Sequence, residues 1–154
     1  AFAQASVLPP AAEAATARDV MQTQVVVVHP DDSVLEAAHR LLQNNIRHLP
    51  VVDGEGKLIG MLSDRDLRSA VGDPRHLLDR GKLRTHFEAV LVRQTMTPTP
   101  LSVGPDTPID EVSQTLIDRH LSALPVTDEE MRVVGIISYV DLLRRSLLAE
   151  RARA

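Results

Sequence analysis

The hydrophobic and polar positions in the first half of the chain predict a β-α-β-β-α order. A β-branched run at 25–28 and two apolar runs at 49–52 and 57–62 are typical of strands. Between them, over residues 34–46, apolar side chains recur at helical spacing, and a short helix is expected at 64–70. Two glycines within 53–56 indicate a tight hairpin turn. The nearly continuous run at 57–62 predicts a strand buried on both faces.

Capping residues define where the helices begin. Ser33 followed by Glu36 has the spacing of a capping box, in which a hydroxyl and an acid satisfy backbone N–H groups reciprocally. Ser63 is placed as the N-cap of the short helix at 64–70. Downstream, Thr107 before Pro108 predicts another N-cap, with Asp110 completing its box.

The same pattern returns 75 positions later without a gap, as the step from Asp66 to Asp141 shows. The stretch 60–66 has a glycine, two apolar residues, a serine and an aspartate at a spacing that 135–141 repeats, and Leu-Pro-Val at 49–51 returns at 124–126. A period of this length indicates a duplicated structural unit. The second copy predicts strands at 101–103, 123–127 and 132–137, and helices at 108–120 and 139–149.

The fold class is therefore α/β (α+β), with two β-α-β-β-α repeats in one chain. We expect an N-terminal arm at 1–17, a first repeat at 18–70, a linker with one or two short helices at 71–93, and a second repeat at 94–150. Pro9-Pro10 and the Ala-rich composition set the arm apart, and Asp73-Pro74 opens the linker.

Composition narrows the class of protein. The net charge is −4 and the basic residues are scattered, so a nucleic-acid partner is not expected. There is no cysteine, which excludes disulfides and thiol chemistry, and no apolar run is long enough to predict a membrane span. The six histidines show no paired metal-ligand spacing, and no serine or threonine stands beside a base and an orienting acid. We therefore expect a cytoplasmic, non-enzymatic protein without a metal or catalytic cofactor.

The two segments RHLPVVDGEGKLIGMLSDRDL and LSALPVTDEEMRVVGIISYVDLL resemble a tandem pair of CBS domains, the arrangement called a Bateman module. The resemblance covers residues 18–148. It implies two small sheets with helices, packed about a pseudo-twofold axis with two clefts between the repeats. It also implies that these clefts bind adenosine-containing ligands such as AMP, ADP, ATP or S-adenosylmethionine.

The residues of the repeated motif suit such a ligand. One carboxylate accepts hydrogen bonds from both hydroxyls of a ribose, which predicts this role for Asp66 and Asp141. Ser63 and Ser138 precede helices, where free N–H groups and the helix dipole favour a phosphate. Serine and aspartate at a helix start are also ordinary capping residues, so capping alone is the competing interpretation.

The resemblance implies two unequal sites, each combining one motif with the first strand and the residues before Leu-Pro-Val of the other repeat. The first comprises Ser63, Asp66, Thr97, Thr99, Ser122 and Ala123, and the second Ser138, Asp141, Thr23, Val25, Arg47 and His48. Because an arginine binds phosphate oxygens bidentately, Arg47 with His48 predicts a more phosphorylated ligand at the second site. Alternatively, Arg47 is a solvated helix-end cation and His48 a neutral residue at the core edge.

Three functions follow, in order of preference. The first is a regulatory or sensor module whose ligand alters the packing of a dimer or of a partner, an enzyme or a transporter. The second is a structural dimerisation module without ligand, favoured if Asp64-Arg65 closes the first site by self-pairing. The third, a small nucleotide hydrolase, has little support. A homodimer is expected because the helices carry more apolar residues than a small sheet covers, namely Leu35, Leu41, Leu42, Ile109, Leu116 and Ile117.

Overall fold

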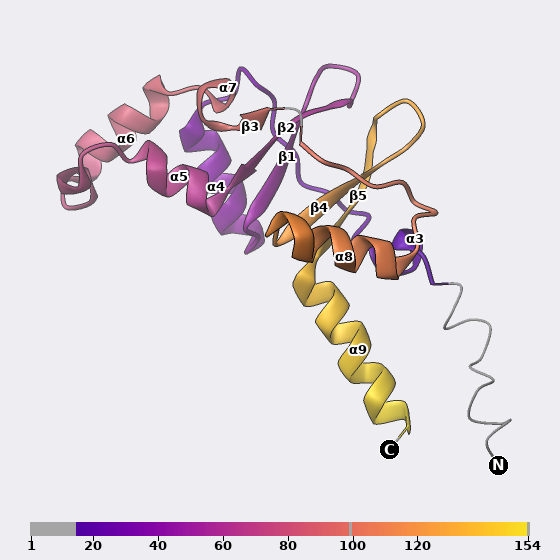
Figure 1. Cartoon of the computed structure of the whole chain (residues 1–154). Helices are drawn as coiled ribbons and strands as arrows, with labels where there is room; N and C mark the ends of the chain where they lie inside the picture. The colour runs from indigo at the N-terminus through magenta and orange to yellow at the C-terminus, as the bar shows by residue number, and fades with distance from the viewer. Residues whose placement is uncertain (1–14, 99, 154) are drawn as a thin grey trace, which may run out of the picture. The chain divides into compact units, whose positions relative to one another are not determined.

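The computed structural model describes residues 15–98 and 100–153, with side chains as far as residue 148. Most of the predicted arm and Thr99 lie outside the described residues. The elements, in chain order, are α3 (Ala17–Val20), α4 (Val34–Asn44), β1 (His48–Val52), β2 (Leu58–Ser63), α5 (Asp64–Ala70), η1 (Pro74–Leu77), α6 (Arg80–Ala89), α7 (Val92–Thr95), β3 (Thr97–Pro98), α8 (Ile109–Arg119), β4 (Ala123–Thr127), β5 (Val133–Ser138) and α9 (Tyr139–Arg153) (Figure 1). Helices mixed with small sheets confirm the predicted fold class.

The chain forms two compact units, each of which draws on both halves of the sequence. We call residues 24–101 with 129–133 the α4 unit, and residues 15–23, 102–128 and 134–153 the α8 unit. The limits predicted from the sequence repeat, 18–70 and 94–150, stay a prediction, as does the linker at 71–93. That segment contains η1 and α6, and α7 begins at its end.

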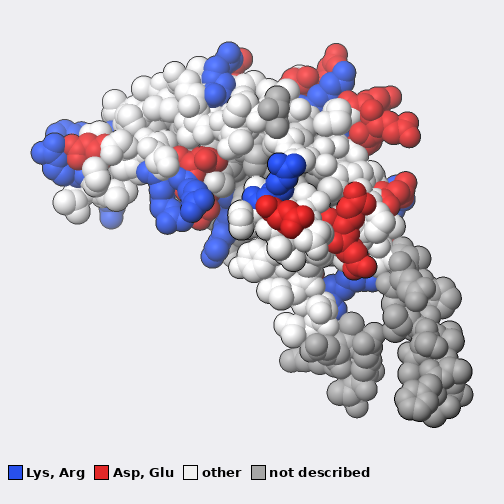
Figure 2. Space-filling model, viewed as in Figure 1, with Lys and Arg blue, Asp and Glu red and all other residues white. Residues whose placement is uncertain are grey.

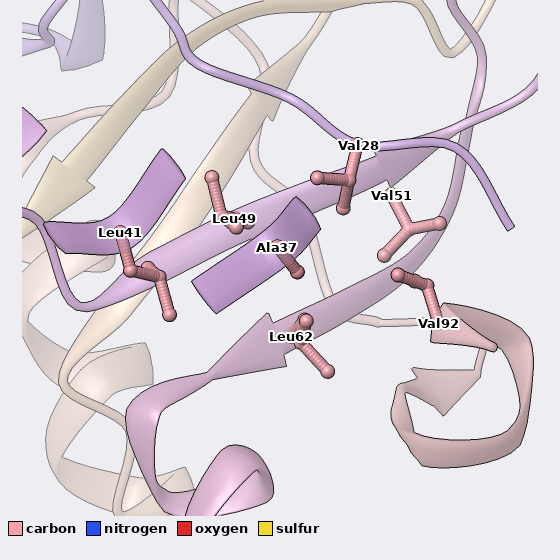
Figure 3. Close-up of a cluster of buried hydrophobic side chains, with 7 residues drawn as sticks. All are labelled: Val28, Ala37, Leu41, Leu49, Val51, Leu62 and Val92. Atoms are coloured by element: carbon pink, nitrogen blue, oxygen red, sulfur yellow. The ribbon is translucent and has the colours of Figure 1, made fainter. Parts of the chain in front are cut away.

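An antiparallel sheet in the order β1-β2-β3 forms the α4 unit, and α4 supplies the helix that covers it. Figure 3 shows the buried side chains of its core, to which a loop, α4, both long strands and α7 contribute: Val28, Ala37, Leu41, Leu49, Val51, Leu62 and Val92. In β2, Leu62 is fully buried, whereas Ile59 and Met61 are half-buried. The prediction that this strand is buried on both faces is therefore wrong, because only one face of the sheet is completely covered.

The α8 unit repeats this architecture with β4 paired to β5 and with α8 over them. Its core consists of Ala17, Val112, Leu116, Leu124, Val126 and Ile137. Leu41 and Leu116, predicted to lie on a dimerising face, are only 5% exposed and belong to the cores of their own units. The residues after them in sequence, Leu42 and Ile117, are 79% and 65% exposed.

Each unit is completed by a segment that precedes the other copy of the repeat in the sequence. The N–H of Val34, at the start of α4, donates to the carbonyl of Val90, and the N–H of Ile109, at the start of α8, donates to Ala15. These pairs are equivalent under the shift of 75 residues. Further along the same segments, Thr97 pairs with Met61 in β2, and Gln22 pairs with Ile136 in β5. The duplicated sequence therefore folds with its leading segments exchanged.

The strands predicted at 25–28 and 101–103 are reduced to single parallel bridges, Val28 with Val51 and Val103 with Val126. Prolines explain why these two segments do not form longer strands. The Val28 N–H donates to Pro50 and its carbonyl accepts from Val52, but continuing this ladder in either direction requires an N–H from Pro50 or Pro30, which proline lacks. The second copy has prolines at the equivalent positions, 125 and 105.

Thr107 does not cap α8, because its hydroxyl accepts the N–H of Gly104 at 3.0 Å within the preceding turn. The N-cap residue is Pro108, and the carbonyl of Ala15 accepts the first helical N–H instead. At α4 the predicted Ser33 cap is confirmed, since its Oγ accepts the Glu36 N–H at 3.1 Å. The Glu36 carboxylate pairs with Arg40 instead of closing the box.

Candidate functional site

The first Ser–Asp pair lies where β2 passes into α5. Asp66 Oδ2 accepts from the N–H of Ser63 at 2.8 Å and from its hydroxyl at 3.0 Å, while the Asp66 N–H donates to Ser63 Oγ at 3.2 Å. This reciprocal capping box fixes the carboxylate at the helix start. Among the described residues, every hydrogen bond accepted by Asp66 ends on Oδ2, so Oδ1 keeps both of its acceptor positions.

The second pair has the same geometry where β5 passes into α9. Asp141 Oδ2 accepts from the N–H and hydroxyl of Ser138 at 2.9 and 3.0 Å, and the Asp141 N–H donates to Ser138 Oγ at 3.3 Å. Its Oδ1 differs from that of Asp66, because it accepts from Gln22 Nε2 at 3.2 Å and lies 3.8 Å from Arg144. The two copies of the motif therefore make the same hydrogen bonds at Oδ2 of the aspartate and differ in the contacts of Oδ1.

The glycine that opens each motif has a packing role. A Cβ added to Gly60 would lie 2.4 Å from the sulfur of Met96, and one added to Gly135 would lie 2.4 Å from the sulfur of Met21. Both methionines belong to the exchanged segments. The motif glycine therefore lets those segments approach the strand that ends in the Ser–Asp pair.

The basic candidates lie beside the first pair. The Arg47 carbonyl accepts the first N–H of α5, from Asp64 at 3.0 Å, and His48 is opposite Ser63 in the β1–β2 register. Burial lowers the pKa of His48, although the nearby carboxylates of Asp64 and Asp66 act in the opposite direction. The ring is half-buried and the Arg47 side chain is exposed. Asp64 itself lies 3.8 Å from Arg68, so the ion pair found for it in this part of the chain is not the predicted one with Arg65.

The equivalent residues of the α8 unit carry no charge. Ser122 accepts the Tyr139 N–H at 3.0 Å through its carbonyl, as Arg47 does for Asp64, and Ala123 replaces His48. Thr23 and Thr97 are exposed, Val25 is half-buried, and Thr99 lies outside the described residues. Each unit therefore brings its own serine and aspartate together with the residues before its Leu-Pro-Val. The groupings that combine residues of both units stay predictions.

The comparisons with known proteins agree with this repeated arrangement. Two segments, residues 17–73 and 92–148, match the CBS domain. The chain is 30% identical over 139 residues to the CBS domain-containing protein YhcV of Bacillus subtilis, with 88% of each protein covered. The chain belongs to the CBS-domain family.

Solved structures of CBS-domain pairs are similar over most of this one. The pair of protein MJ0100, crystallised with 5′-methylthioadenosine and S-adenosyl-L-methionine, matches with a TM-score of 0.72 and 29% identity, covering 89% of this chain and 98% of that one. CBSX2 of Arabidopsis thaliana, crystallised with AMP, matches with a TM-score of 0.73 and 28% identity, covering 88% and 98%. The chain also spans about a quarter of the length of several curated relatives. One is the L-aspartate semialdehyde sulfurtransferase of Methanocaldococcus jannaschii, 29% identical and covered over 22% of its length, against 82% of this chain.

Three other features of this CBS-domain pair bear on its function: a surface hollow, the distribution of charge, and, among the described residues, the lack of metal-ligating clusters and membrane-spanning helices. A surface hollow between the hairpin tips of the α4 unit is lined by Glu55, Lys57, Glu130 and Arg132, which pair locally as Lys57–Glu55 and Arg132–Glu130. Basic and acidic side chains are interspersed on the face shown in Figure 2. Within residues 15–98 and 100–153, no group of three or more metal-ligating side chains is found, and no helix is long and apolar enough to span a membrane.

Sequence reasoning missed Gln22, which touches the predicted ribose carboxylate Asp141. The repeat itself contained the signal, because the shift of 75 pairs Gln22 with the predicted site residue Thr97. A lone glutamine before a threonine carries no motif of its own. Its position beside Asp141 follows from the exchange of the leading segments, which the linear pattern does not show.

Proposed function

We propose that this CBS-domain pair is a non-enzymatic regulatory module that binds adenosine-containing ligands at its two Ser–Asp pairs. The observation that carries the proposal is the capping box, which holds each carboxylate while leaving Oδ1 of Asp66 open to hydroxyl donors. A ribose supplies two such donors, and charge-assisted hydrogen bonds of this kind are stronger than neutral ones. Support also comes from the similar pairs crystallised with AMP and with S-adenosyl-L-methionine.

The remaining predicted residues complete the proposal. Exposed Arg47 supplies a cation for phosphate oxygens, and half-buried His48 and the start of α5 lie beside it. Thr23, Val25, Thr97, Thr99, Ser122 and Ala123 contribute backbone groups and edges around the base and sugar. A ligand that binds one packing of the module more tightly than another shifts the equilibrium between the two packings by its difference in affinity for them. That shift would alter a dimer, or a partner that is an enzyme or a transporter.

Calorimetric titration with AMP, ATP and S-adenosylmethionine tests the binding proposal. Asp66→Asn and Asp141→Asn each remove a carboxylate at nearly constant volume, and together they are expected to abolish adenosyl binding. Asp79→Asn is the matched control, because Asp79 accepts the Lys82 N–H at the start of α6 away from either motif. Unchanged binding in the double variant contradicts the role of the carboxylates, and absence of binding to the unaltered protein contradicts the function.

A structural homodimer without ligand is the second candidate, favoured by Leu42 and Ile117. These exposed residues are equivalent under the repeat and lie at the same position of α4 and α8. Burying two such side chains in a dimer interface stabilises the dimer by about 25 cal/mol for each Å² of apolar surface removed from water. Light scattering after size-exclusion chromatography is expected to show a dimer that Leu42→Glu with Ile117→Glu dissociates, with Gln43→Glu as a control on the same helix. A monomer at all concentrations contradicts the dimer.

A further inference from the structure

The two Ser–Asp pairs differ in how many acceptor positions they leave for a ligand. A carboxylate has about four lone-pair positions, two on each oxygen. In both pairs the serine N–H and hydroxyl occupy the two positions of Oδ2. Asp66 therefore offers two positions on Oδ1, which equals the number of hydroxyls in a ribose diol. Asp141 offers one, because the side-chain amide of Gln22 donates to its Oδ1.

This difference comes from a single side chain on matching backbones. Gln22 pairs with Ile136 in β5, and its N–H and carbonyl both bond to that residue, at 2.9 and 3.0 Å. In the α4 unit, Thr97 pairs with Met61 of β2, and these two residues are equivalent to Gln22 and Ile136. Both side chains are exposed. In the part of the chain that the structure describes, Thr97 makes no hydrogen bond to Asp66, because its hydroxyl is on a shorter side chain than the glutamine amide.

Arg144 also lies near Oδ1 of Asp141, whereas its equivalent in the first copy is Ser69. The distance is 3.8 Å and the arginine side chain is 63% exposed, so this is a weak, solvent-screened ion pair. The Asp141 side chain itself is only 10% exposed. The glutamine amide, which is within hydrogen-bond distance, is therefore the group that occupies a position on this oxygen.

We propose that Gln22 is an intramolecular competitor for the ligand's ribose at Asp141, so that the Asp66 pair binds an adenosyl ligand first and the Asp141 pair binds it more weakly. The inference rests on the proposed function, because it assigns an order of occupancy to the same two pairs. For a ribose to bond through both hydroxyls, the Gln22 amide must leave Oδ1 and return to water. Releasing one hydrogen bond to a charged group corresponds to about a tenfold loss of affinity.

Each pair is measured in isolation by calorimetry on the full chain. Asp66→Asn leaves the Asp141 pair, and Asp141→Asn leaves the Asp66 pair. In the Asp66→Asn background, Gln22→Ala is expected to raise AMP affinity about tenfold. In the Asp141→Asn background, the reciprocal change Thr97→Gln is expected to lower it by a similar factor. Both substitutions keep the backbone pairing of the exchanged segment, and thermal unfolding confirms that each variant is folded.

A second probe, 2′-deoxy-AMP, separates competition for the ribose from a general effect on the fold. The isolated Asp66 pair is expected to lose affinity when the 2′-hydroxyl is absent, because it binds both hydroxyls. The isolated Asp141 pair is expected to distinguish the two ligands poorly, and Gln22→Ala is expected to restore the distinction. If Gln22 had a purely structural role, Gln22→Ala would change the affinities for AMP and for 2′-deoxy-AMP by the same factor.

The outcomes separate the two proposals. If Gln22→Ala leaves AMP affinity unchanged while the double aspartate variant still abolishes binding, the competition is refuted. If Gln22→Ala weakens AMP binding, the competition is also refuted, and Gln22 instead orients Asp141. If no adenosyl ligand binds the unaltered protein, the proposed function fails first. If the double aspartate variant binds as well as the unaltered protein, the role of the two carboxylates fails first. A gain in the Asp66→Asn background together with restored 2′-hydroxyl dependence supports the competition.

Discussion

Replacing the motif glycine with alanine tests whether that glycine serves packing. At Gly135 the new methyl group would lie 2.4 Å from Met21 Sδ, 2.9 Å from Cγ and 3.1 Å from Cβ. Ordinary contacts to a Cβ lie at 3.4–4 Å. Rotating the end of the methionine cannot relieve the contact with its own Cβ, which the backbone holds. The next residue along, Gln22, is hydrogen-bonded to Ile136 in both directions.

The expected cost follows from the contacts. Overpacking a core typically costs about 1–3 kcal/mol, and Gly135→Ala belongs near the top of that range because three methionine atoms are too close. In a protein of about 150 residues, ~1 kcal/mol shifts the midpoint of thermal unfolding by about 2–4 °C. We therefore expect a decrease of about 6–10 °C. Gly60→Ala should cost less, because its two shortest contacts, at 2.4 and 3.1 Å, are to Met96 Sδ and Cγ, which a rotamer change can move. Its third contact, 3.2 Å from the backbone carbonyl oxygen of Thr97, remains after that change, so some cost is still expected.

Urea and thermal unfolding of three alanine variants measure these costs. Gly54→Ala is the matched control, because its added Cβ has no neighbour within 4 Å and the variant should stay within about 0.5 kcal/mol of the unaltered protein. Combining Gly135→Ala with Met21→Ala should cost less than the sum of the two single changes, since the methyl group fills space that the methionine leaves. If Gly135→Ala is as harmless as Gly54→Ala, the packing role of the motif glycine is refuted.

Three further predictions concern single residues. Burial lowers the pKa of His48, so the unfolded chain takes up a proton on this residue at higher pH than the folded chain does. The free energy of unfolding should therefore rise as the pH is raised toward 6.5 and then level off. His48→Gln should reduce the pH dependence of the urea midpoint measured from pH 5 to 7. Met131, in the second hairpin, has φ of 65°, and its equivalent in the first hairpin is Gly56, with φ of 82°. Because this region of φ favours glycine, Met131→Gly should raise the thermal midpoint by the equivalent of about 0.5–1 kcal/mol. A decrease would show that the side-chain contacts of Met131 matter more than its backbone strain. Ser63→Ala removes the α5 cap and should cost about 1 kcal/mol of unfolding free energy in urea, whereas Ser69→Ala, on the same helix, should change it by less than half as much.

Local physics determined much of this protein. Short apolar runs placed β1 and β2, apolar residues at helical spacing placed α4, and the Ser63 cap placed the start of α5. The cap at Ser63 was also predictable, since a hydroxyl before a helix meets N–H groups that lack intrahelical partners. The shift of 75 residues showed a duplicated unit with a Ser–Asp pair in both copies, and the two repeated segments resemble a pair of CBS domains.

Only the tertiary structure decided which copy each leading segment completes. Residues 15–22 and 90–97 occupy equivalent positions in the repeat and bond to equivalent partners, so position in the repeat alone does not choose between the two copies. The same choice explains why Thr107 is not a cap, because the exchanged Ala15 carbonyl serves the start of α8. It also brings Gln22 to Asp141. A hydrogen bond between residues more than a hundred positions apart depends on how the chain packs as a whole, and periodicity reports only on neighbours within one element.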